Sequence, residues 1–325
     1  MRRRILVAAL LLLSVATPRV ATAQGTRFAV IVQGASGDPD YATQHRSWVD
    51  GLAKILRDRF GFDADRIYVL AEEPKAGETR GTAENVRAVL GRLAKEATAQ
   101  DFVFVMLIGH GSTDGASAKF NLVGPDLTME EWKVLLDPVA ARMAIVNSTS
   151  SSFPFLAGLS GKNRVVITAT NSAAQRYHTM FSDAFIRSLT APEADADKNG
   201  RISLLEAFDN AARLVALYYE QSDHLSTETA LIDDNGDGKG RAANATGDDG
   251  SVAGLTYLDV VAAPRSSDPE VQALLLKQQG LVEQIDDLRR RRSSLSPEEF
   301  DREFERLIVD LALVSRDVRA RTIKK

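Results

Sequence analysis

The sequence predicts an α/β protein with a mostly parallel sheet, followed by an α-helical hairpin. Residues 27–190 alternate between short, continuous apolar segments and longer segments with helical periodicity. Apolar segments without polar alternation are typical of strands that are covered on both faces, as in parallel sheets. From residue 268 onward, apolar residues recur at spacings of three and four, which indicates two amphipathic helices.

Five strands and two helices are expected before residue 190. The strands are predicted at 28–32, 66–70, 102–108, 143–146 and 165–168, and the helices at 47–60 and 82–97. In such sheets ligands bind at the carboxyl ends of the strands. The loops after residues 33, 108, 146 and 168 are therefore the places where a site is expected.

The composition is that of a folded, globular chain. The 325 residues are 44% hydrophobic and 26% charged, which excludes wholesale disorder. The sequence contains no cysteine. Disulfides, cysteine-ligated zinc, iron–sulfur clusters and a cysteine nucleophile are therefore all excluded.

Residues 1–23 have the pattern of a secretory signal peptide, with arginines at 2, 3 and 4, an apolar run over 5–16 and Ala-Thr-Ala before the cleavage point. An uncleaved anchor is the alternative, although the apolar run is short for a bilayer. Loss of four arginines and no acid would change the formal charge from −4 to −8. We therefore expect an exported bacterial protein, periplasmic or secreted, that binds no nucleic acid and has no membrane span after cleavage.

The composition changes near residues 264–267, from an acidic segment to a tail with equal numbers of acids and bases. This predicts a main domain over 24–263 and a coiled-coil-like helical hairpin over 268–325. Ser296-Pro297-Glu298-Glu299 has the pattern of a helix start. The hairpin is expected either to cover a face of the main domain or to mediate self-association or partner docking.

A histidine between glycines follows the most apolar strand, in the order Gly109-His110-Gly111. This placement suits a general base. The segment resembles the histidine loop of the caspase–legumain clan of cysteine peptidases, in which an apolar strand also ends in a His-Gly turn. Further segments resemble legumain-like sequences in the same order: 28–34, 40–46, 65–70 and 165–171. The resemblance covers roughly residues 27–260 and implies a caspase-like three-layer sandwich.

The resemblance also implies a cysteine nucleophile just after the strand that follows the histidine loop. Here that strand is followed by Asn147, Ser148, Thr149 and Ser150, so Ser148 stands at the expected cysteine position. One hypothesis is a pseudo-peptidase that binds a peptide or protein in the former cleft, lined by Gly109, Gly111, Asn147 and Ser150. The alternative is a serine hydrolase with Ser148 as nucleophile and His110 as base. The first is favoured, because a hydroxyl is far less acidic than a thiol and no acid is placed behind His110.

Residues 195–206 match the twelve-residue calcium loop of an EF-hand. A helix is expected directly after the loop, over 203–220, and an acidic turn that caps this helix without an ion is the alternative. The predicted Ca²⁺ ligands are Asp195, Asp197, Asn199, the carbonyl of Arg201, Ser203 and Glu206.

A second acidic run places Asp233, Asn235 and Asp237 at the same one–three–five spacing, but Asn244 stands where the loop needs a glutamate. Weaker calcium binding and a polar turn before a strand near 256–261 are both open. The remaining histidines are His45, His178 and His224. Their spacing in the sequence brings no two histidines together as a metal pair, so a zinc site is not expected.

Overall fold

The structure is a computed structural model that describes residues 25–114, 117–172, 174–260, 266, 268–292 and 295–322. The predicted signal peptide lies outside these residues. Within the described part of the chain, no helix combines the length and the apolar character that crossing a bilayer requires.

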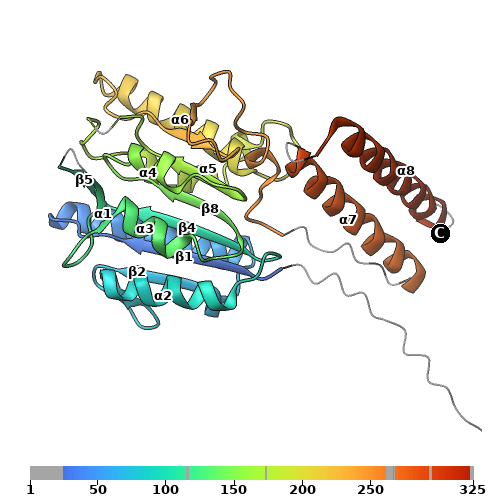
Figure 1. Cartoon of the computed structure of the whole chain (residues 1–325), viewed down its shortest axis with the longest axis horizontal. Helices are drawn as coiled ribbons and strands as arrows, with labels where there is room; N and C mark the ends of the chain where they lie inside the picture. Colours follow the sequence, from blue (N-terminus) through green and yellow to red (C-terminus); the bar gives the residue numbers. More distant parts are fainter. Residues whose placement is uncertain are drawn as a thin grey trace, which may run out of the picture.

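The main domain is built on an eight-stranded sheet with the order β11-β10-β9-β8-β4-β1-β2-β3 (Figure 1). The pairs from β9 to β3 are all parallel, and only β10 and β11 pair in the antiparallel direction. The predicted mostly parallel sheet is therefore confirmed. The strands are β1 (Arg27–Gln33), β2 (Ile67–Ala71), β3 (Thr79–Arg80), β4 (Phe102–Ile108), β8 (Arg142–Asn147), β9 (Arg164–Thr168), β10 (Leu231–Asp233) and β11 (Arg241–Ala242).

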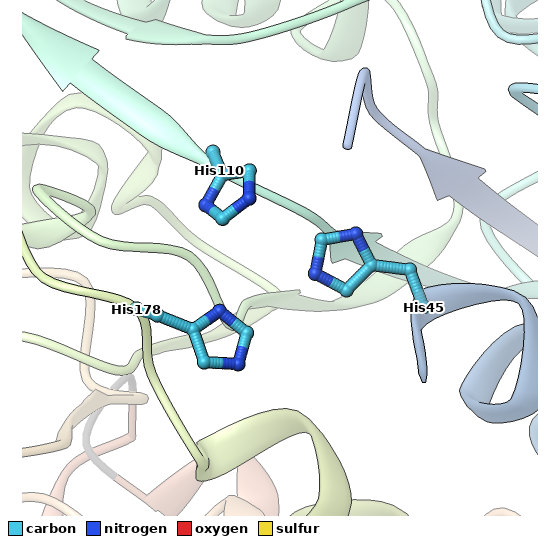
Figure 2. A group of neighbouring side chains, drawn as sticks. All are labelled: His45, His110 and His178. Atoms are coloured by element: carbon cyan, nitrogen blue, oxygen red, sulfur yellow. The ribbon is translucent and has the colours of Figure 1, made fainter. Parts of the chain in front are cut away.

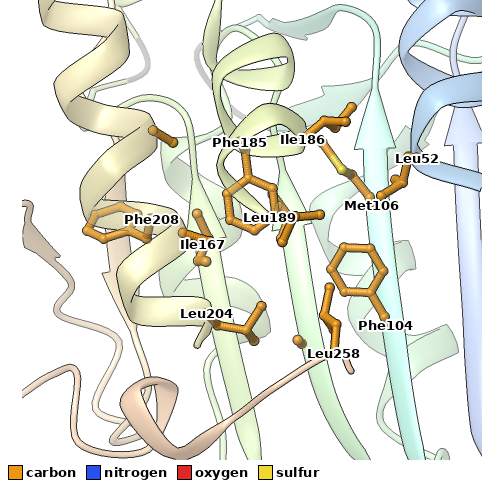
Figure 3. Packing of buried hydrophobic residues seen from close by; sticks show 14 of the residues in the cluster. Leu52, Phe104, Met106, Ile167, Phe185, Ile186, Leu189, Leu204, Phe208 and Leu258 are labelled. Carbon is orange, nitrogen blue, oxygen red and sulfur yellow. The ribbon is translucent and has the colours of Figure 1, made fainter. Parts of the chain in front are cut away.

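Helices cover both faces of this sheet, which makes a three-layer sandwich (Figure 1). Strand β4 is buried along its whole length, and its side chains alternate between two hydrophobic clusters. Phe104 and Met106 pack with α1 (Pro39–Lys54), α5 (Phe181–Ser188) and α6 (Leu204–Gln221), as Figure 3 shows. Val103 and Val105 belong to the cluster of the opposite face, which includes residues of α2 (Ala83–Glu96), α3 (Met129–Leu136) and α4 (Phe153–Leu159).

A small antiparallel sheet begins directly after His110, with the order β5-β6-β7. It contains β5 (Gly111–Thr113), β6 (Ala118–Phe120) and β7 (Leu127–Thr128). The sequence analysis predicted none of these short strands. β5 lies at one edge of the small sheet, next to the histidine loop.

The C-terminal segment forms the predicted hairpin, with α7 (Pro269–Arg290) and α8 (Pro297–Thr322). Its side chains form a separate hydrophobic cluster that includes Leu281, Ile285, Phe300 and Leu307. The Ser296 hydroxyl accepts the backbone N–H of Glu299 at 3.3 Å, as the capping sequence predicts.

Two element predictions differ from the structure. The helix expected at 47–60 begins at Pro39, where Asp38 caps it, and its last turn widens into a π-helix over Ile55–Arg59. The strand expected near 256–261 was wrong for the described residues 256–260, which form only an isolated bridge between Tyr257 and Ser203. The sheet is extended by β10 and β11 instead, and residue 261 lies outside the described residues.

Candidate functional site

The loops that follow β1, β4, β8 and β9 meet at one edge of the sheet, because these four strands are adjacent and parallel. His110 lies in the loop after β4, and Ser148 directly follows β8. The four loops in which a site was expected therefore lie together at this edge.

His110 is held by the loop after β1. Its Nε2 lies 3.1 Å from the carbonyl oxygen of Ser36. Because a carbonyl only accepts, Nε2 carries the proton in this contact. Burial lowers the pKa of His110 from its ordinary value, and the hydrogen bond to Ser36 opposes that effect.

The adjoining turn needs a glycine at Gly109. Its φ is +144°, and a Cβ there would lie 3.2 Å from the backbone nitrogen of Gly34. An L side chain rarely adopts this backbone conformation. The turn that directs His110 toward Ser36 is therefore specified by glycine.

The Ser148 hydroxyl is engaged by residues other than His110. Its side chain is fully buried, and its hydroxyl donates to the Leu107 carbonyl at 2.6 Å and accepts from Ser182 Oγ at 2.7 Å. His110 is not among the hydrogen-bond partners of this hydroxyl. The serine-hydrolase alternative requires that contact, so the geometry gives it no support.

Thr149 and Ser150 are the residues that face the histidine loop. Ser150 Oγ donates to the Gly111 carbonyl at 2.9 Å and accepts the Gly111 N–H at 3.3 Å. A Cβ at Gly111 would lie 2.7 Å from Thr149 Oγ1, whose hydroxyl donates to Asn147 Oδ1 at 2.7 Å. Ser150, Asn147 and Gly111 were predicted as pocket residues, whereas Thr149 was missed, because a single sequence does not give the register of β8 against β4.

Three histidines converge at this edge, as Figure 2 shows. His45 comes from α1, His110 from the loop after β4, and His178 from the segment before α5. One ring nitrogen from each lies within 4.8 Å of those of the other two. The expectation that no two histidines come together was therefore wrong. His224 is exposed in the segment after α6.

His45 is buried, His110 and His178 are half-buried, and all three rings lie against aromatic side chains. Tyr41 lies 4.5 Å from His178 and 4.9 Å from His110 between ring centroids, and Trp48 stacks on His178 at 6.0 Å. His45 Nε2 and both ring nitrogens of His178 are buried without a partner. Burial is the largest cause that lowers the pKa of His45 to about 3 and that of His178 to about 4.

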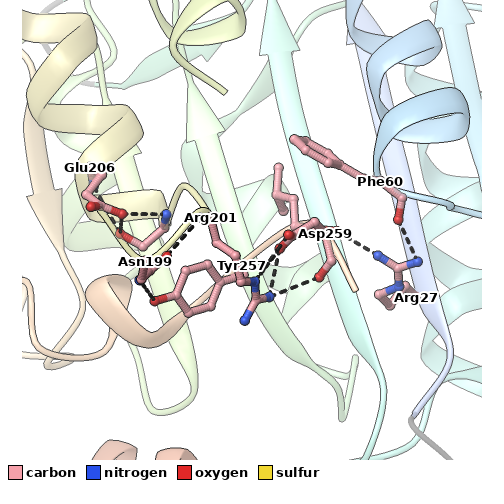
Figure 4. A network of polar contacts seen from close by, with 9 residues as sticks. Arg27, Phe60, Asn199, Arg201, Glu206, Tyr257 and Asp259 are labelled. Carbon is pink, nitrogen blue, oxygen red and sulfur yellow. Dashed lines mark hydrogen bonds and ion pairs between the residues drawn. The ribbon is translucent and has the colours of Figure 1, made fainter. Parts of the chain in front are cut away.

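The predicted calcium loop brings a second set of possible metal ligands together. Figure 4 shows Asn199, Arg201 and Glu206 of this loop. Carboxylate oxygens of Asp195, Asp197 and Glu206 lie within 4.8 Å of one another. Backbone N–H groups at the turn point toward these acids: Gly200 donates to Asp195 Oδ2 at 2.9 Å, and Ala196 donates to Glu206 Oε1 at 2.9 Å. Glu206 also forms a capping box with Ser203 at the start of α6.

Two other predicted ligands of this loop, Asn199 and Arg201, have partners nearby. Asn199 accepts the N–H of Arg201 at 2.8 Å and donates to the hydroxyl of Tyr257 at 3.2 Å. The Arg201 side chain is turned away from the acids and pairs with Asp259 at 2.7 Å. Nearby, Arg27 donates to the carbonyl of Leu258 at 2.6 Å, which attaches this segment to β1.

The second acidic run forms a glycine-rich turn. Asp233 accepts the N–H groups of Gly236 and Gly238 at 3.0 and 2.8 Å, and Asn235 accepts that of Asp237 at 2.8 Å. Among the described residues, two groups of three side chains are close enough to share a metal ion, and neither group includes a residue of this run. Its role as a weaker calcium site stays a prediction.

Comparison with family models and with curated proteins gives no match. Among solved structures, the chain is similar to the protein GSU0716 from Geobacter sulfurreducens, with 14% identity and a TM-score of 0.41, over 69% of this chain and 95% of that one. It is also similar to the Drosophila initiator caspase Dronc, with 12% identity and a TM-score of 0.42, over 67% of this chain and 82% of that one. Similarities of this size support no conclusion about activity or substrate.

Proposed function

We propose that this protein is an exported legumain- and caspase-like peptidase homologue that does not hydrolyse peptides and instead binds a peptide or protein segment beside the histidine loop. The observation that carries the proposal is the state of Ser148. Its hydroxyl is buried and engaged by Leu107 and Ser182, so it is not available to attack a substrate carbonyl. The sequence offers no thiol that could replace it.

Exposed aromatic side chains next to the site support a binding role. Tyr177 precedes His178 and is 64% exposed, and Phe153 follows the serine-rich loop and is 38% exposed. Large aromatic side chains supply much of the binding energy in protein interfaces.

Calcium is proposed as a structural ion in the 195–206 loop. Three carboxylates converge there, and the hard oxygen donors match the preference of Ca²⁺. The loop lies at the start of α6, whose Phe208 packs in the core beside Phe181 of α5. An ion there would fix the position of α6 without contributing to chemistry at the histidine loop.

The hairpin carries a second candidate function, self-association or partner docking. Several of its large apolar side chains are exposed although the hairpin has a hydrophobic seam of its own. Exposed apolar surface of this kind is typical of interaction sites. These residues are Leu276, Val282, Ile308, Val309 and Leu313.

The first experiment is incubation of the mature protein with a proteome-derived peptide library, with and without Ca²⁺, followed by mass spectrometry of cleaved and of retained peptides. We expect no cleavage and selective retention. Tyr177→Ala should retain less, whereas Tyr218→Ala, an exposed tyrosine on α6, should retain as much as the parent.

The outcomes separate the functions. Cleavage that disappears in His110→Ala would establish a hydrolase and refute the pseudo-peptidase proposal. Equal retention by both tyrosine variants would show that the peptide does not bind beside the histidine loop. Loss of retention or of dimers on removal of residues 268–325 alone would assign the binding function to the hairpin.

A further inference from the structure

We propose that His45, His110 and His178 together bind one divalent transition-metal ion, with Zn²⁺ as the best match. The site is separate from the predicted calcium loop, and its existence does not depend on peptide binding. The proposal stands on the convergence of three imidazoles from three separate segments, on their unpartnered nitrogens and on the group that orients two of them.

The geometry is close to that of a three-histidine site. Zn²⁺ binds imidazole nitrogen at about 2.0–2.1 Å, so two ligand atoms of a tetrahedral ion lie about 3.3 Å apart. In this structure one nitrogen from each ring already lies within 4.8 Å of the others. Small rotations of the three side chains would close the remaining distance.

The unpartnered nitrogens are the strongest sign of a missing ligand. His45 is fully buried, and its Nε2 has no hydrogen-bond partner. Both ring nitrogens of His178 are buried and unpartnered as well. A buried polar atom without a partner costs about 1–3 kcal/mol, so such atoms are rare in native proteins. A metal ion would give one nitrogen of each ring a partner.

Ser36 orients two of the three rings. Its carbonyl accepts from His110 Nε2 at 3.1 Å, which leaves Nδ1 of a neutral His110 with a free lone pair. Its hydroxyl lies 3.2 Å from His45 Nδ1. When Nδ1–H donates to this hydroxyl, the lone pair of His45 Nε2 is free for an ion. Metal-ligating histidines usually donate their second N–H to a neighbouring acceptor in this way.

The protonation state suits metal binding. A histidine must be neutral to act as a ligand. Burial lowers the pKa of all three histidines, which favours the neutral form. The aromatic shell of Tyr41 and Trp48 contributes to that burial.

The ligand types select the ion. Three imidazoles suit Zn²⁺, Cu²⁺, Ni²⁺ and Co²⁺, whereas Ca²⁺ and Mg²⁺ require oxygen donors. No carboxylate belongs to the histidine group, and no histidine belongs to the Asp195 group. Among the described residues, the histidine group thus suits a transition metal, and the separate Asp195 group suits Ca²⁺.

Three protein ligands leave one position of a tetrahedral ion open. Structural zinc sites are usually closed by four protein ligands, whereas sites that act on a ligand keep the fourth position for water or substrate. The ion is therefore expected to hold a water molecule or an anionic oxygen at the edge of the sheet where β4 and β9 end.

The test uses the mature full-length protein without a histidine tag, freed of metal and saturated with Ca²⁺ so that the acidic loops are occupied. Zn²⁺ is added, and bound metal is counted after gel filtration. We expect one Zn²⁺ per chain. His178→Ala should lower the affinity by at least about 100-fold, since it removes a ligand rather than an outer partner. His224→Ala, which changes the exposed fourth histidine, should bind like the parent.

A second readout does not depend on any variant. Co²⁺ bound to the parent protein should give the intense visible absorption of a tetrahedral site. It should also quench the fluorescence of Trp48, which stacks on His178 and whose ring centroid lies 5.5 Å from that of His45. Added Zn²⁺ should reverse both signals. Ser36→Ala removes only the hydroxyl partner of His45, and we expect a loss of affinity of about 10-fold.

Two results would overturn the proposal. One is a parent protein that binds no stoichiometric Zn²⁺ and shows no tetrahedral Co²⁺ spectrum. The other is equal affinity in the His178 and His224 variants. If the protein binds metal but retains no peptide, only the peptide-binding proposal fails. If it retains peptides but binds no metal, only the metal-site proposal fails.

Discussion

A buried carboxyl group, Glu228, should make the stability of the main domain fall as the pH rises toward neutrality. Its side chain is 3% exposed and accepts N–H groups from Met180 at 2.7 Å and Phe181 at 3.1 Å. It also accepts the hydroxyl hydrogen of Tyr219 at 3.1 Å. Burial raises the pKa of Glu228 to about 7 although these three donors lower it. Through its hydrogen bonds to Met180 and Phe181, the carboxyl group holds the start of α5, and Met180 is two residues after His178.

The sign follows from proton linkage. The pKa in the folded state, about 7, lies above the ordinary value of 4.5 that applies in the unfolded chain. The folded state therefore binds more protons between these two values, and stability is lost as the pH rises through that window. A shift of this size makes the contribution of Glu228 to the free energy of unfolding fall by about 2.5 kcal/mol from about pH 5 to about pH 8.

Urea unfolding of the parent and of Glu228→Gln, at constant Ca²⁺ and across this pH range, measures the effect. A glutamine stays neutral in both states, so subtracting the two curves removes the contribution of every other titrating group. The substitution itself should lower the free energy of unfolding by an amount that does not depend on pH, because an amide offers one acceptor atom instead of two. The parent should in addition lose about 2.5 kcal/mol relative to the variant as the pH rises.

Glu220→Gln serves as the control, because Glu220 lies exposed near the end of the same helix, α6, that carries Tyr219. It should leave the pH dependence unchanged. Parallel curves for the parent and Glu228→Gln would refute the reasoning, since they would mean that burial does not perturb this carboxyl.

Three further predictions concern the histidine loop, the calcium loop and the hairpin. Gly111→Ala should destabilise the protein by about 1–3 kcal/mol in thermal unfolding, because its Cβ would lie 2.2 Å from the Ser150 carbonyl. Gly51→Ala in α1, with open space around it, should stabilise the protein by about 0.5–1 kcal/mol. Ca²⁺ at 100 times its Kd should stabilise the parent by about 2.7 kcal/mol in the same assay, but not Glu206→Gln. Deleting 268–325 should leave the melting temperature of the main domain unchanged, because the hairpin residues form their own hydrophobic cluster.

The main elements of the fold could be predicted because continuous apolar segments and helical periodicity are local signals. The predicted strand at 102–108 coincides with β4, and the helix predicted at 82–97 corresponds to α2. The short strands β5 to β7 could not be predicted in the same way. They contain two or three residues each, which is too short for a hydrophobic pattern to be recognised in the sequence.

The candidate site could be predicted only as far as the edge of the sheet. Gly109-His110-Gly111 is a local motif at a strand end, and the structure places it where parallel strands end together. The orientation of Ser148 is a tertiary property. It is set by its contacts with Leu107 on β4 and Ser182 on α5, and neither partner is near it in the sequence.

The histidine cluster shows why spacing along the chain is a poor guide to metal sites in parallel sheets. His45 and His178 lie far apart in the sequence, yet β1 and β9 lie on either side of β4 and β8. Each histidine follows the carboxyl end of a different strand, so strand order, rather than sequence distance, decides which of them meet. Strand ends could be located from the sequence, but their order could not, because continuous apolar strands can pair in many orders. A zinc site built in this way has no motif in the sequence, and for that reason metal binding by the intact protein is the measurement that decides what this edge of the sheet does.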